Sequence, residues 1–161
     1  MNVVLVEPEI PPNTGNVARL CAATGTELHL IEPLGFALND TQLKRAGMDY
    51  WHHVAWHRWP DWTRFQDHLP NGATLWFIES NGPRLYTEAK FSPADWLVFG
   101  RETAGLPRKL LEGHSEHWLR IPMFNRDARS LNLSNCVALV LFEALRQQGF
   151  QGEVGTGRET A

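Results

Sequence analysis

Cysteine is scarce in this chain of 161 residues, which carries only Cys21 and Cys136. Two cysteines are too few for a disulfide framework, and both lie in apolar patterns with helical spacing, where a lone cysteine usually acts as a small buried hydrophobe. The CxxC and HExxH spacings of common metal sites are also absent, and the seven histidines are scattered. We therefore expect no metal and a structural role for each histidine.

Long hydrophobic runs are missing as well. Apolar residues make up 43% of the chain, and no window approaches the length of a membrane span. The opening MNVVLVEPEI lacks the basic start and the cleavage site of an export signal. These absences lead us to expect a soluble, cytoplasmic protein with no membrane partner.

An excess of positive charge is lacking too. The formal net charge is −3, which argues against a protein whose whole surface attracts nucleic acid. Residues 101–129 nevertheless hold six basic and four acidic residues. A solvated face is the simpler interpretation of this small local excess.

Three common ligand signatures are absent: GxGxxG, GxxxxGK[ST] and GxSxG. Without them, the dinucleotide-binding, P-loop and serine-hydrolase interpretations lose the residues on which their chemistry depends.

What the sequence does contain is an alternation of short apolar runs and helical patterns. We predict strands at Val3–Glu7, Leu28–Ile31, His53–Trp56, Thr74–Ile78, Trp96–Phe99 and Trp118–Ile121. We predict helices at Asn16–Thr24, Asn39–Ala46, Asp61–Leu69 and Pro107–Glu112, and a last apolar helix that includes Leu133 to Leu145 and that Gly149 ends. The segment Ser80–Asp95 has mixed turn signals and supports no assignment.

This alternation predicts an α/β fold in which helices cover both faces of a parallel sheet. One domain suffices; we assign it residues 1–150 and expect the glycine-rich tail, residues 151–161, to be disordered. Ligands of such sheets bind beyond the carboxyl ends of the strands. Three loops rich in Gly, Pro, Asn or Ser should meet there: Pro8–Asn16, Gly100–Pro107 and Ile121–Asn135.

The last of these loops leads into the final helix through Ser130, Asn132, Ser134 and Asn135. Small hydroxyl and amide side chains at a helix start can cap its unpaired N–H groups, and they can also hold a ligand. A cap needs only one or two such residues. We expect Ser134 to serve in both roles.

The three loops carry the blocks EPEIPPNTGN, FGRETAGLP, and RIPM with SLNLSN, and the run IEPLGF follows the second predicted strand. In this order and spacing the blocks resemble the motifs of the SPOUT superfamily of RNA methyltransferases over nearly the whole chain. The resemblance is strongest to its ribose 2′-O-methyltransferases, in particular the small enzymes that modify the wobble nucleotide of tRNA. Any one block would be a weak signal, whereas three in order are specific.

The resemblance implies an S-adenosylmethionine cofactor, a trefoil knot in the C-terminal half and a homodimer. By matching positions, it assigns the cofactor pocket to Ile78 and the turn after it, to Gly100 with its neighbours, and to Ile121, Met123, Ser130 and Leu133. It assigns catalysis to Arg19, Glu102, Ser134 and Asn135. Because a guanidinium stays protonated, we expect Arg19 to orient the ribose and stabilise the developing oxyanion rather than to act as a base.

For RNA contacts we predict Asn13, Lys44, Arg45, Arg101, Arg126 and Arg129. Simpler roles stand beside these. Asn13 would only cap the first helix, Arg19 would pair with Glu7 or Glu9, and Glu102 would brace its own loop against Arg129.

We therefore expect an enzyme that transfers a methyl group from S-adenosylmethionine to the ribose 2′-hydroxyl of the wobble cytidine or uridine of leucine tRNAs. One alternative is a 2′-O-methyltransferase of another tRNA position or of rRNA. The other is a non-catalytic, dimeric RNA-binding protein.

Overall fold

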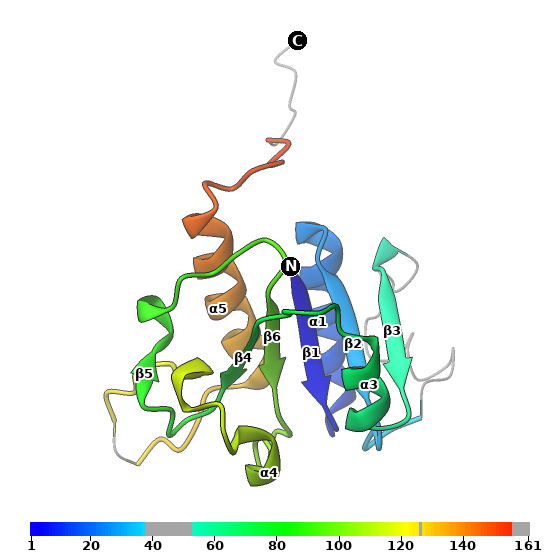
Figure 1. Cartoon of the computed structure of the whole chain (residues 1–161), viewed down its shortest axis with the longest axis vertical. Coiled ribbons are helices and arrows are strands. Elements are labelled where there is room, and N and C mark those ends of the chain that lie inside the picture. The colour runs from blue at the N-terminus through cyan, green and yellow to red at the C-terminus, as the bar shows by residue number, and fades with distance from the viewer. Residues whose placement is uncertain (38–52, 126, 156–161) are drawn as a thin grey trace.

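The computed structural model describes residues 1–37, 53–125 and 127–155. Seven strands form one sheet in the order β3-β2-β1-β6-β4-β7-β5, and every neighbouring pair is parallel (Figure 1). The strands are β1 (Asn2–Val6), β2 (Glu27–Ile31), β3 (Trp56–Trp59), β4 (Leu75–Ile78), β5 (Arg84–Leu85), β6 (Trp96–Phe99) and β7 (Trp118–Arg120). The predicted α/β fold with a parallel sheet is confirmed.

The central strand β1 shows why these strands are continuous apolar runs. Successive side chains of a strand point to opposite faces of the sheet. Val3 and Leu5 belong to one core cluster, and Val4 and Val6 belong to the other. Because both faces are covered, every one of these positions must be apolar.

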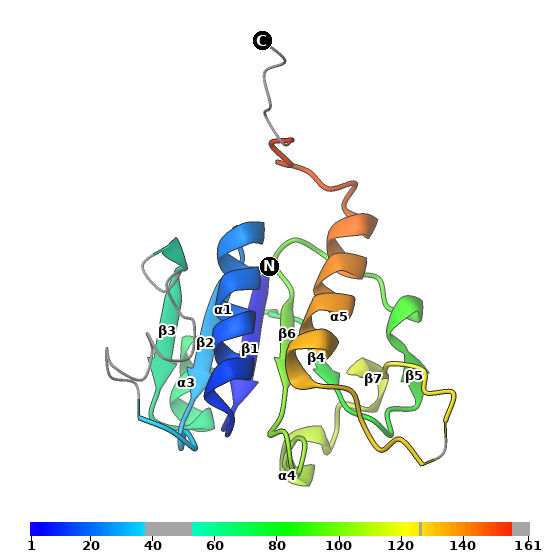
Figure 2. The same ribbon diagram turned by 180° about the vertical axis from the view of Figure 1, so that it is seen from behind.

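Within the described part of the chain, two helices cover each face. On one face α1 (Pro11–Thr24) and α5 (Leu133–Gln147) lie side by side (Figure 2). Val17 of α1 and Val137 and Leu141 of α5 enter the core cluster beneath them. On the other face, α3 (Trp62–His68) contributes Phe65 and α4 (Arg108–Leu111) contributes Leu111 to the second cluster.

The structure corrects the start of the first helix, which we predicted at Asn16 and which begins at Pro11. Proline lacks an N–H group and has a preset φ, so it starts a helix without losing a hydrogen bond. The prediction that Asn13 caps this helix is wrong, because Asn13 lies inside α1. The N-cap residue is Ile10, and its side chain makes no capping hydrogen bond.

The third strand is also displaced from its predicted position. We predicted His53–Trp56, whereas β3 is Trp56–Trp59 and pairs with β2 from Leu28 to Ile31. The run of Trp and His from Trp51 to Trp59 has no clear alternation of apolar and polar residues, so periodicity could not locate the strand. The unassigned segment Ser80–Asp95 contains β5 and a 3₁₀ turn, Tyr86–Glu88; another, Ser115–His117, precedes β7.

The last helix agrees with the prediction in its apolar face and in its end. Its buried residues include Val137, Val140 and Leu141, and Gly149 adopts the left-handed conformation with φ 67° just beyond it. The prediction that Ser134 caps the helix is wrong. The N-cap residue is Asn132, whose side chain accepts from the Ser134 backbone N–H at 2.9 Å.

The carboxyl ends of the parallel strands all lie at the bottom of the sheet in Figures 1 and 2. The turns after β4, β6 and β7 and the starts of α1 and α5 meet there. Among the described residues, no helix is long and apolar enough to cross a membrane. The predicted helix Asn39–Ala46 and the predicted RNA contacts Lys44, Arg45 and Arg126 lie outside the described residues.

Candidate active site

A cavity of about 460 Å³ opens at the carboxyl ends of β4, β6 and β7. Its walls come from the start of α1, from the turns that follow these three strands and from the start of α5. Every residue predicted to contact a cofactor lines it, namely Ile78, Gly100, Ile121, Met123, Ser130 and Leu133. Three motifs far apart in the sequence therefore share one cavity.

The turn after β6 is a closed loop that only glycine permits. Arg101 and Gly105 exchange backbone hydrogen bonds of 3.1 and 2.9 Å. A Cβ added to Gly100 would lie 2.2 Å from the carbonyl carbon of Gly105, far inside van der Waals contact. The missing side chain thus lets the main chain fold back on itself at the wall of the cavity.

Glu79, just beyond β4, holds the same loop from its other side. Its carboxylate accepts the Leu106 N–H at 2.6 Å and its own neighbour's N–H, that of Ser80, at 3.2 Å. Glu79 and Ser80 both line the cavity. The resemblance assigned the turn after Ile78 to the pocket but singled out neither residue, since a lone Glu after a strand carries no motif.

Glu102 connects the turn after β6, residues 100–107 (the β6 loop), to α1. Its carboxylate accepts the backbone N–H groups of Glu9 at 2.8 Å and Ile10 at 3.2 Å, and the Asn13 side-chain amide at 3.1 Å. Because Ile10 cannot cap α1 with its own side chain, Glu102 supplies this end of the helix with an acceptor. Its described partners belong to α1 and the segment before it, so the predicted brace against Arg129 is wrong.

Asn13 extends this connection to α5. Its amide donates to Glu102, and its carbonyl oxygen accepts from the Asn132 amide at 2.8 Å. The Asn132 carbonyl oxygen in turn accepts the Ser134 N–H and, at 2.6 Å, the Ser134 hydroxyl. One hydrogen-bonded chain therefore runs from the β6 loop through α1 to the first turn of α5. We predicted its members Asn13, Glu102 and Ser134, but not Asn132 as their connector.

Two acidic residues before α1 make further contacts with the β6 loop. Glu7 forms an ion pair with Arg101, and Glu9 accepts the backbone N–H and the hydroxyl of Thr103 at 3.1 and 2.7 Å. These hydrogen bonds from Thr103 lower the pKa of the Glu9 carboxyl. Arg101 is thus already paired with a carboxylate of its own chain.

The remaining predicted site residues occupy different places. Arg129 lines the cavity. Arg19 lies on the exposed side of α1, outside the residues that line the cavity. Ser134 and Asn135 are in the first turn of α5, between the cavity-lining residues Leu133 and Cys136.

The cavity lacks the groups of several familiar reactions. Burial raises the pKa of the Cys136 thiol to about 11, so it stays protonated at neutral pH and cannot serve as a thiolate nucleophile. Among the described residues, no histidine lines the cavity. What the cavity does offer is an apolar wall, closely approaching main chain and preorganised polar side chains. That combination suits a flat aromatic ring with a polar edge.

The fold and the cavity together define a parallel α/β protein with a nucleotide-sized site at the carboxyl ends of its strands. A model of the SpoU rRNA Methylase family matches residues 1–142. The chain belongs to this family.

Within that family the chain is similar to tRNA (cytidine(34)-2′-O)-methyltransferases. The enzyme of Burkholderia cenocepacia is 52% identical over 153 residues, which cover 94% of this chain and 97% of the relative. The enzyme of Escherichia coli K12 is 46% identical over 155 residues, which cover 96% and 98%. The likeness therefore spans nearly the whole of each chain, and the predicted membership of the RNA 2′-O-methyltransferases is confirmed.

Solved structures show the same likeness in three dimensions. One that concerns the 2-OH methylation of C/U34 on tRNA is 44% identical with a TM-score of 0.87, and the match covers 93% of this chain and 97% of that one. An AdoMet-bound rRNA methyltransferase from Sinorhizobium meliloti is 27% identical with a TM-score of 0.75, and the match covers 90% and 55%.

Proposed function

We propose that this chain transfers a methyl group from S-adenosylmethionine to the ribose 2′-hydroxyl of nucleotide 34, the wobble position of tRNA. The main support is that the three motifs line one cavity. The chain that carries them is similar over nearly its full length to enzymes of this activity. Leucine tRNAs are the substrates we propose to test first.

The residues of the cavity fit an adenosyl group. Its volume of about 460 Å³ lies within the range of small-molecule sites. Ile78, Ile121, Met123 and Leu133 would hold the ring in an apolar slot, and the main chain at Gly100 can approach its polar edge. When bound, S-adenosylmethionine supplies an electrophilic methyl group on a sulfonium.

For this reaction the chain must mainly align its substrate, because a direct displacement depends on the alignment of its reacting atoms. Glu102 already accepts three hydrogen bonds from the α1 region, so we assign it the task of positioning α1. Asn132 and Ser134 continue that task at the start of α5. The cavity wall is thus preorganised before a ligand arrives.

Arg19 is our candidate for contact with the ribose. Its position on the exposed side of α1 and outside the cavity lining suits a role toward the RNA rather than toward the cofactor. A guanidinium donates in a planar fork and can stabilise a developing oxyanion. Arg19→Lys should therefore lower kcat far more than it changes cofactor affinity; a lysine variant with nearly intact rate would contradict a special role for the fork.

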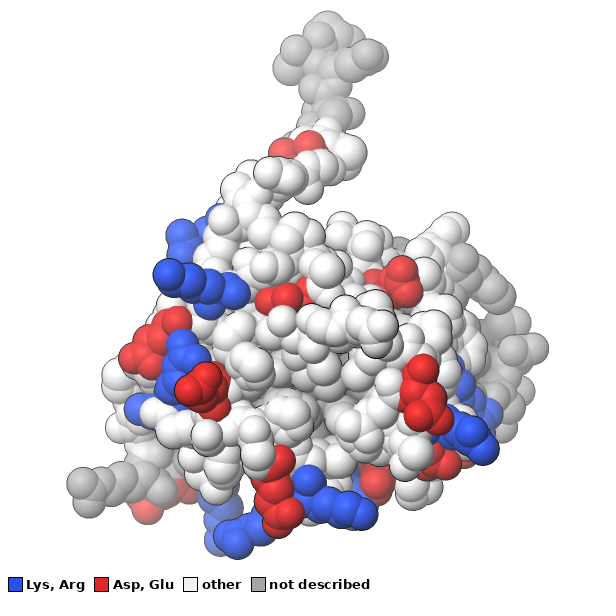
Figure 3. Space-filling model, viewed as in Figure 1, with Lys and Arg blue, Asp and Glu red and all other residues white. Residues whose placement is uncertain are grey.

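A homodimer would enlarge the surface available to tRNA. On the face shown in Figure 3, the described basic and acidic side chains are interspersed and form no continuous positive patch. On the outer side of α5, Leu139 and Phe142 are 42% and 47% exposed and lie three residues apart, on one side of the helix. We propose that such residues pack against a second copy, and that the C-terminal half forms a trefoil knot, as the resemblance implies.

Tritiated methyl transfer to bulk tRNA tests the proposal directly. We expect label in tRNA, nuclease mapping of it to nucleotide 34, and loss of tRNA binding with added salt. Label at another position or in rRNA would keep the chemistry and overturn the substrate. Binding of RNA without any methyl transfer would support the non-catalytic alternative. Calorimetry with S-adenosylhomocysteine measures cofactor binding separately.

A further inference from the structure

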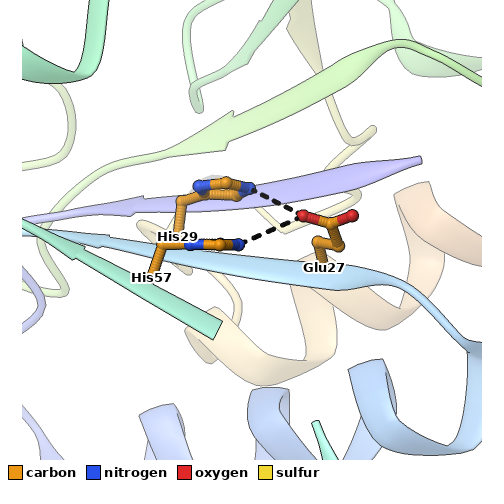
Figure 4. A group of neighbouring side chains, drawn as sticks. All are labelled: Glu27, His29 and His57. Atoms are coloured by element: carbon orange, nitrogen blue, oxygen red, sulfur yellow. Dashed lines mark hydrogen bonds and ion pairs between the residues drawn. The ribbon is translucent and has the colours of Figure 1, made fainter. Parts of the chain in front are cut away.

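Three side chains converge at the β2–β3 side of the sheet, away from the cavity. Glu27 opens β2, His29 lies two residues further along it, and His57 pairs with His29 across to β3 (Figure 4). The Glu27 carboxylate oxygen is 3.3 Å from Nε2 of His57 and 3.9 Å from Nε2 of His29. The three ligand atoms all lie within 4.8 Å of one another.

The buried member of this group has a polar atom without a partner. His29 is 1% exposed, and its Nε2 faces Glu27 and makes no hydrogen bond. Its other ring nitrogen, Nδ1, accepts the indole N–H of Trp59 at 3.2 Å. Because Nδ1 accepts this hydrogen bond, the ring cannot carry protons on both nitrogens and is neutral. A neutral ring that accepts at Nδ1 carries its proton on Nε2.

We propose that Glu27, His29 and His57 form a zinc site that fastens the edge strand β3 to β2. Zinc bound at about 2.0–2.2 Å in tetrahedral geometry holds its ligand atoms roughly 3.4 Å apart. The two carboxylate–nitrogen separations, 3.3 and 3.9 Å, are close to this spacing. The two imidazoles stack with their centroids 4.8 Å apart and their planes 15° from parallel, so they must tilt toward each other for both Nε2 atoms to bind one ion. Two imidazoles and one carboxylate favour Zn²⁺ over Mg²⁺, which prefers oxygen ligands, and water can fill the fourth position.

Binding has a specific consequence for Trp59. Zinc takes the lone pair of Nε2, so the proton that Nε2 carried moves to Nδ1 and the ring stays neutral. Nδ1 then becomes a donor and can no longer accept the indole N–H of Trp59. Metal-bound histidines usually donate their second N–H to an acceptor. Here the second nitrogen faces a donor, so Trp59 opposes the metal and must turn away when zinc binds.

The first test measures zinc affinity against a chromophoric chelator, on the full chain freed of metal with EDTA. We expect one zinc per chain, and an affinity lower by at least about tenfold in both His57→Ala and Glu27→Gln. His114→Ala is the matched control, since His114 is also exposed but lies outside the group; it should bind as the unaltered chain does. Mg²⁺ should not compete. Absence of binding, or equal affinity in all four proteins, would overturn the site.

The second test uses the opposing effect of Trp59. Trp59→Phe keeps an aromatic ring beside His29 but removes the indole N–H, so it should tighten zinc binding by about tenfold. In the unaltered chain, one indole N–H resonance should shift on addition of zinc, and the same resonance should stay in place in His57→Ala. Unchanged or weaker binding by Trp59→Phe would contradict the proposed geometry. Neither readout depends on methyl transfer.

Discussion

The sheet differs in its hydrogen bonding between two regions: the carboxyl ends of its strands, where the cavity lies, and its lateral edge at β2 and β3. At the carboxyl ends, Glu102, Asn13 and Asn132 satisfy one another in a continuous hydrogen-bonded chain. At the β2–β3 edge, His29 is buried among aromatic rings with one ring nitrogen unpartnered. A satisfied network holds a shape ready for a ligand, whereas an unpartnered buried group costs stability. We therefore expect substitutions at the carboxyl ends to change ligand binding or methyl transfer as well as stability, and substitution of His29 at the β2–β3 edge to change the pH dependence of stability.

The largest effect should come from the glycine that closes the β6 loop. In Gly100→Ala the new Cβ would lie 2.2 Å from Gly105 and 2.3 Å from the backbone nitrogen of Leu106, and neither backbone atom can move aside cheaply. We expect a loss of more than about 4 kcal/mol in the free energy of unfolding, measured in urea, and no detectable S-adenosylhomocysteine binding. Gly72→Ala is the control: it meets no atom within 4 Å and should cost only about 1 kcal/mol for its positive φ. A Gly100→Ala protein of normal stability and affinity would show that the loop is not closed as described.

The next effect concerns the β2–β3 edge and appears as a dependence of the free energy of unfolding on pH. The pKa of His29 falls on folding from 6.5 to about 3, so between these values the unfolded chain binds more protons than the folded one. The contribution of this group to the free energy of unfolding is therefore fully present above pH 6.5 and is lost as the pH falls toward 3, by roughly 4 kcal/mol across this window.

His29→Phe isolates that contribution, because it keeps an aromatic ring and removes the titrating group. We expect urea unfolding between pH 4 and pH 7 to show a shallower pH dependence in the variant, whatever its absolute stability. Carboxylates titrate in both proteins, so only the difference in slope reports on His29. Equal slopes would mean that His29 is not held neutral by burial.

A smaller effect should follow removal of the acceptor that joins the β6 loop to α1. Glu102→Ala leaves two backbone N–H groups and the Asn13 amide without their partner, and we expect a loss of about 2 kcal/mol in the free energy of unfolding. Methyl transfer should fall by about a hundredfold, mostly in kcat, as expected when preorganised positioning is lost. Glu112→Ala, at an exposed position of no known contact with α1, is the control. An intact rate in Glu102→Ala would exclude the positioning role.

Comparing these two regions also shows which parts of the fold and the site could be predicted from the sequence. The strands β1 and β6 and the helix α5 were predictable because burial on both faces, or on one helical side, imposes an apolar period that can be read locally. The positions of the cavity residues followed from the resemblance. None of this required knowledge of which side chains touch.

What could not be predicted depends on contacts between distant segments. The Asn13–Asn132 hydrogen bond joins residues 119 positions apart, and Glu79 reaches Leu106 across 27. The prolines at the start of α1 suggested a loop, although proline also suits the first positions of a helix. The carboxylate that accepts hydrogen bonds at this helix start belongs to Glu102, which lies 92 positions from Ile10. The histidines of the β2–β3 edge gave no motif spacing, since they meet only through the register of two neighbouring strands.

The smallest effect on stability offers the finest test of the hydrogen-bonded chain. Asn132 does two things: its carbonyl oxygen caps α5 through Ser134, and its amide donates to Asn13. Serine is a good N-cap residue but has no second group to reach α1, so Asn132→Ser should keep the cap and lose the connection. Asn132→Ala should lose both.

We therefore expect Asn132→Ala to lower the free energy of unfolding by about 1 kcal/mol, and Asn132→Ser by only a few tenths. Methyl transfer should nevertheless fall in both, because the link between α1 and α5 serves the cavity and not the helix. Combining Asn132→Ser with Asn13→Ala gives a double-mutant cycle: if the pair acts as a unit, the second substitution should add little to the loss of rate. Additive losses of rate would mean that the two amides serve the cavity separately. The hydrogen bonds at the carboxyl ends of the strands would then be independent local contacts and not one connected chain.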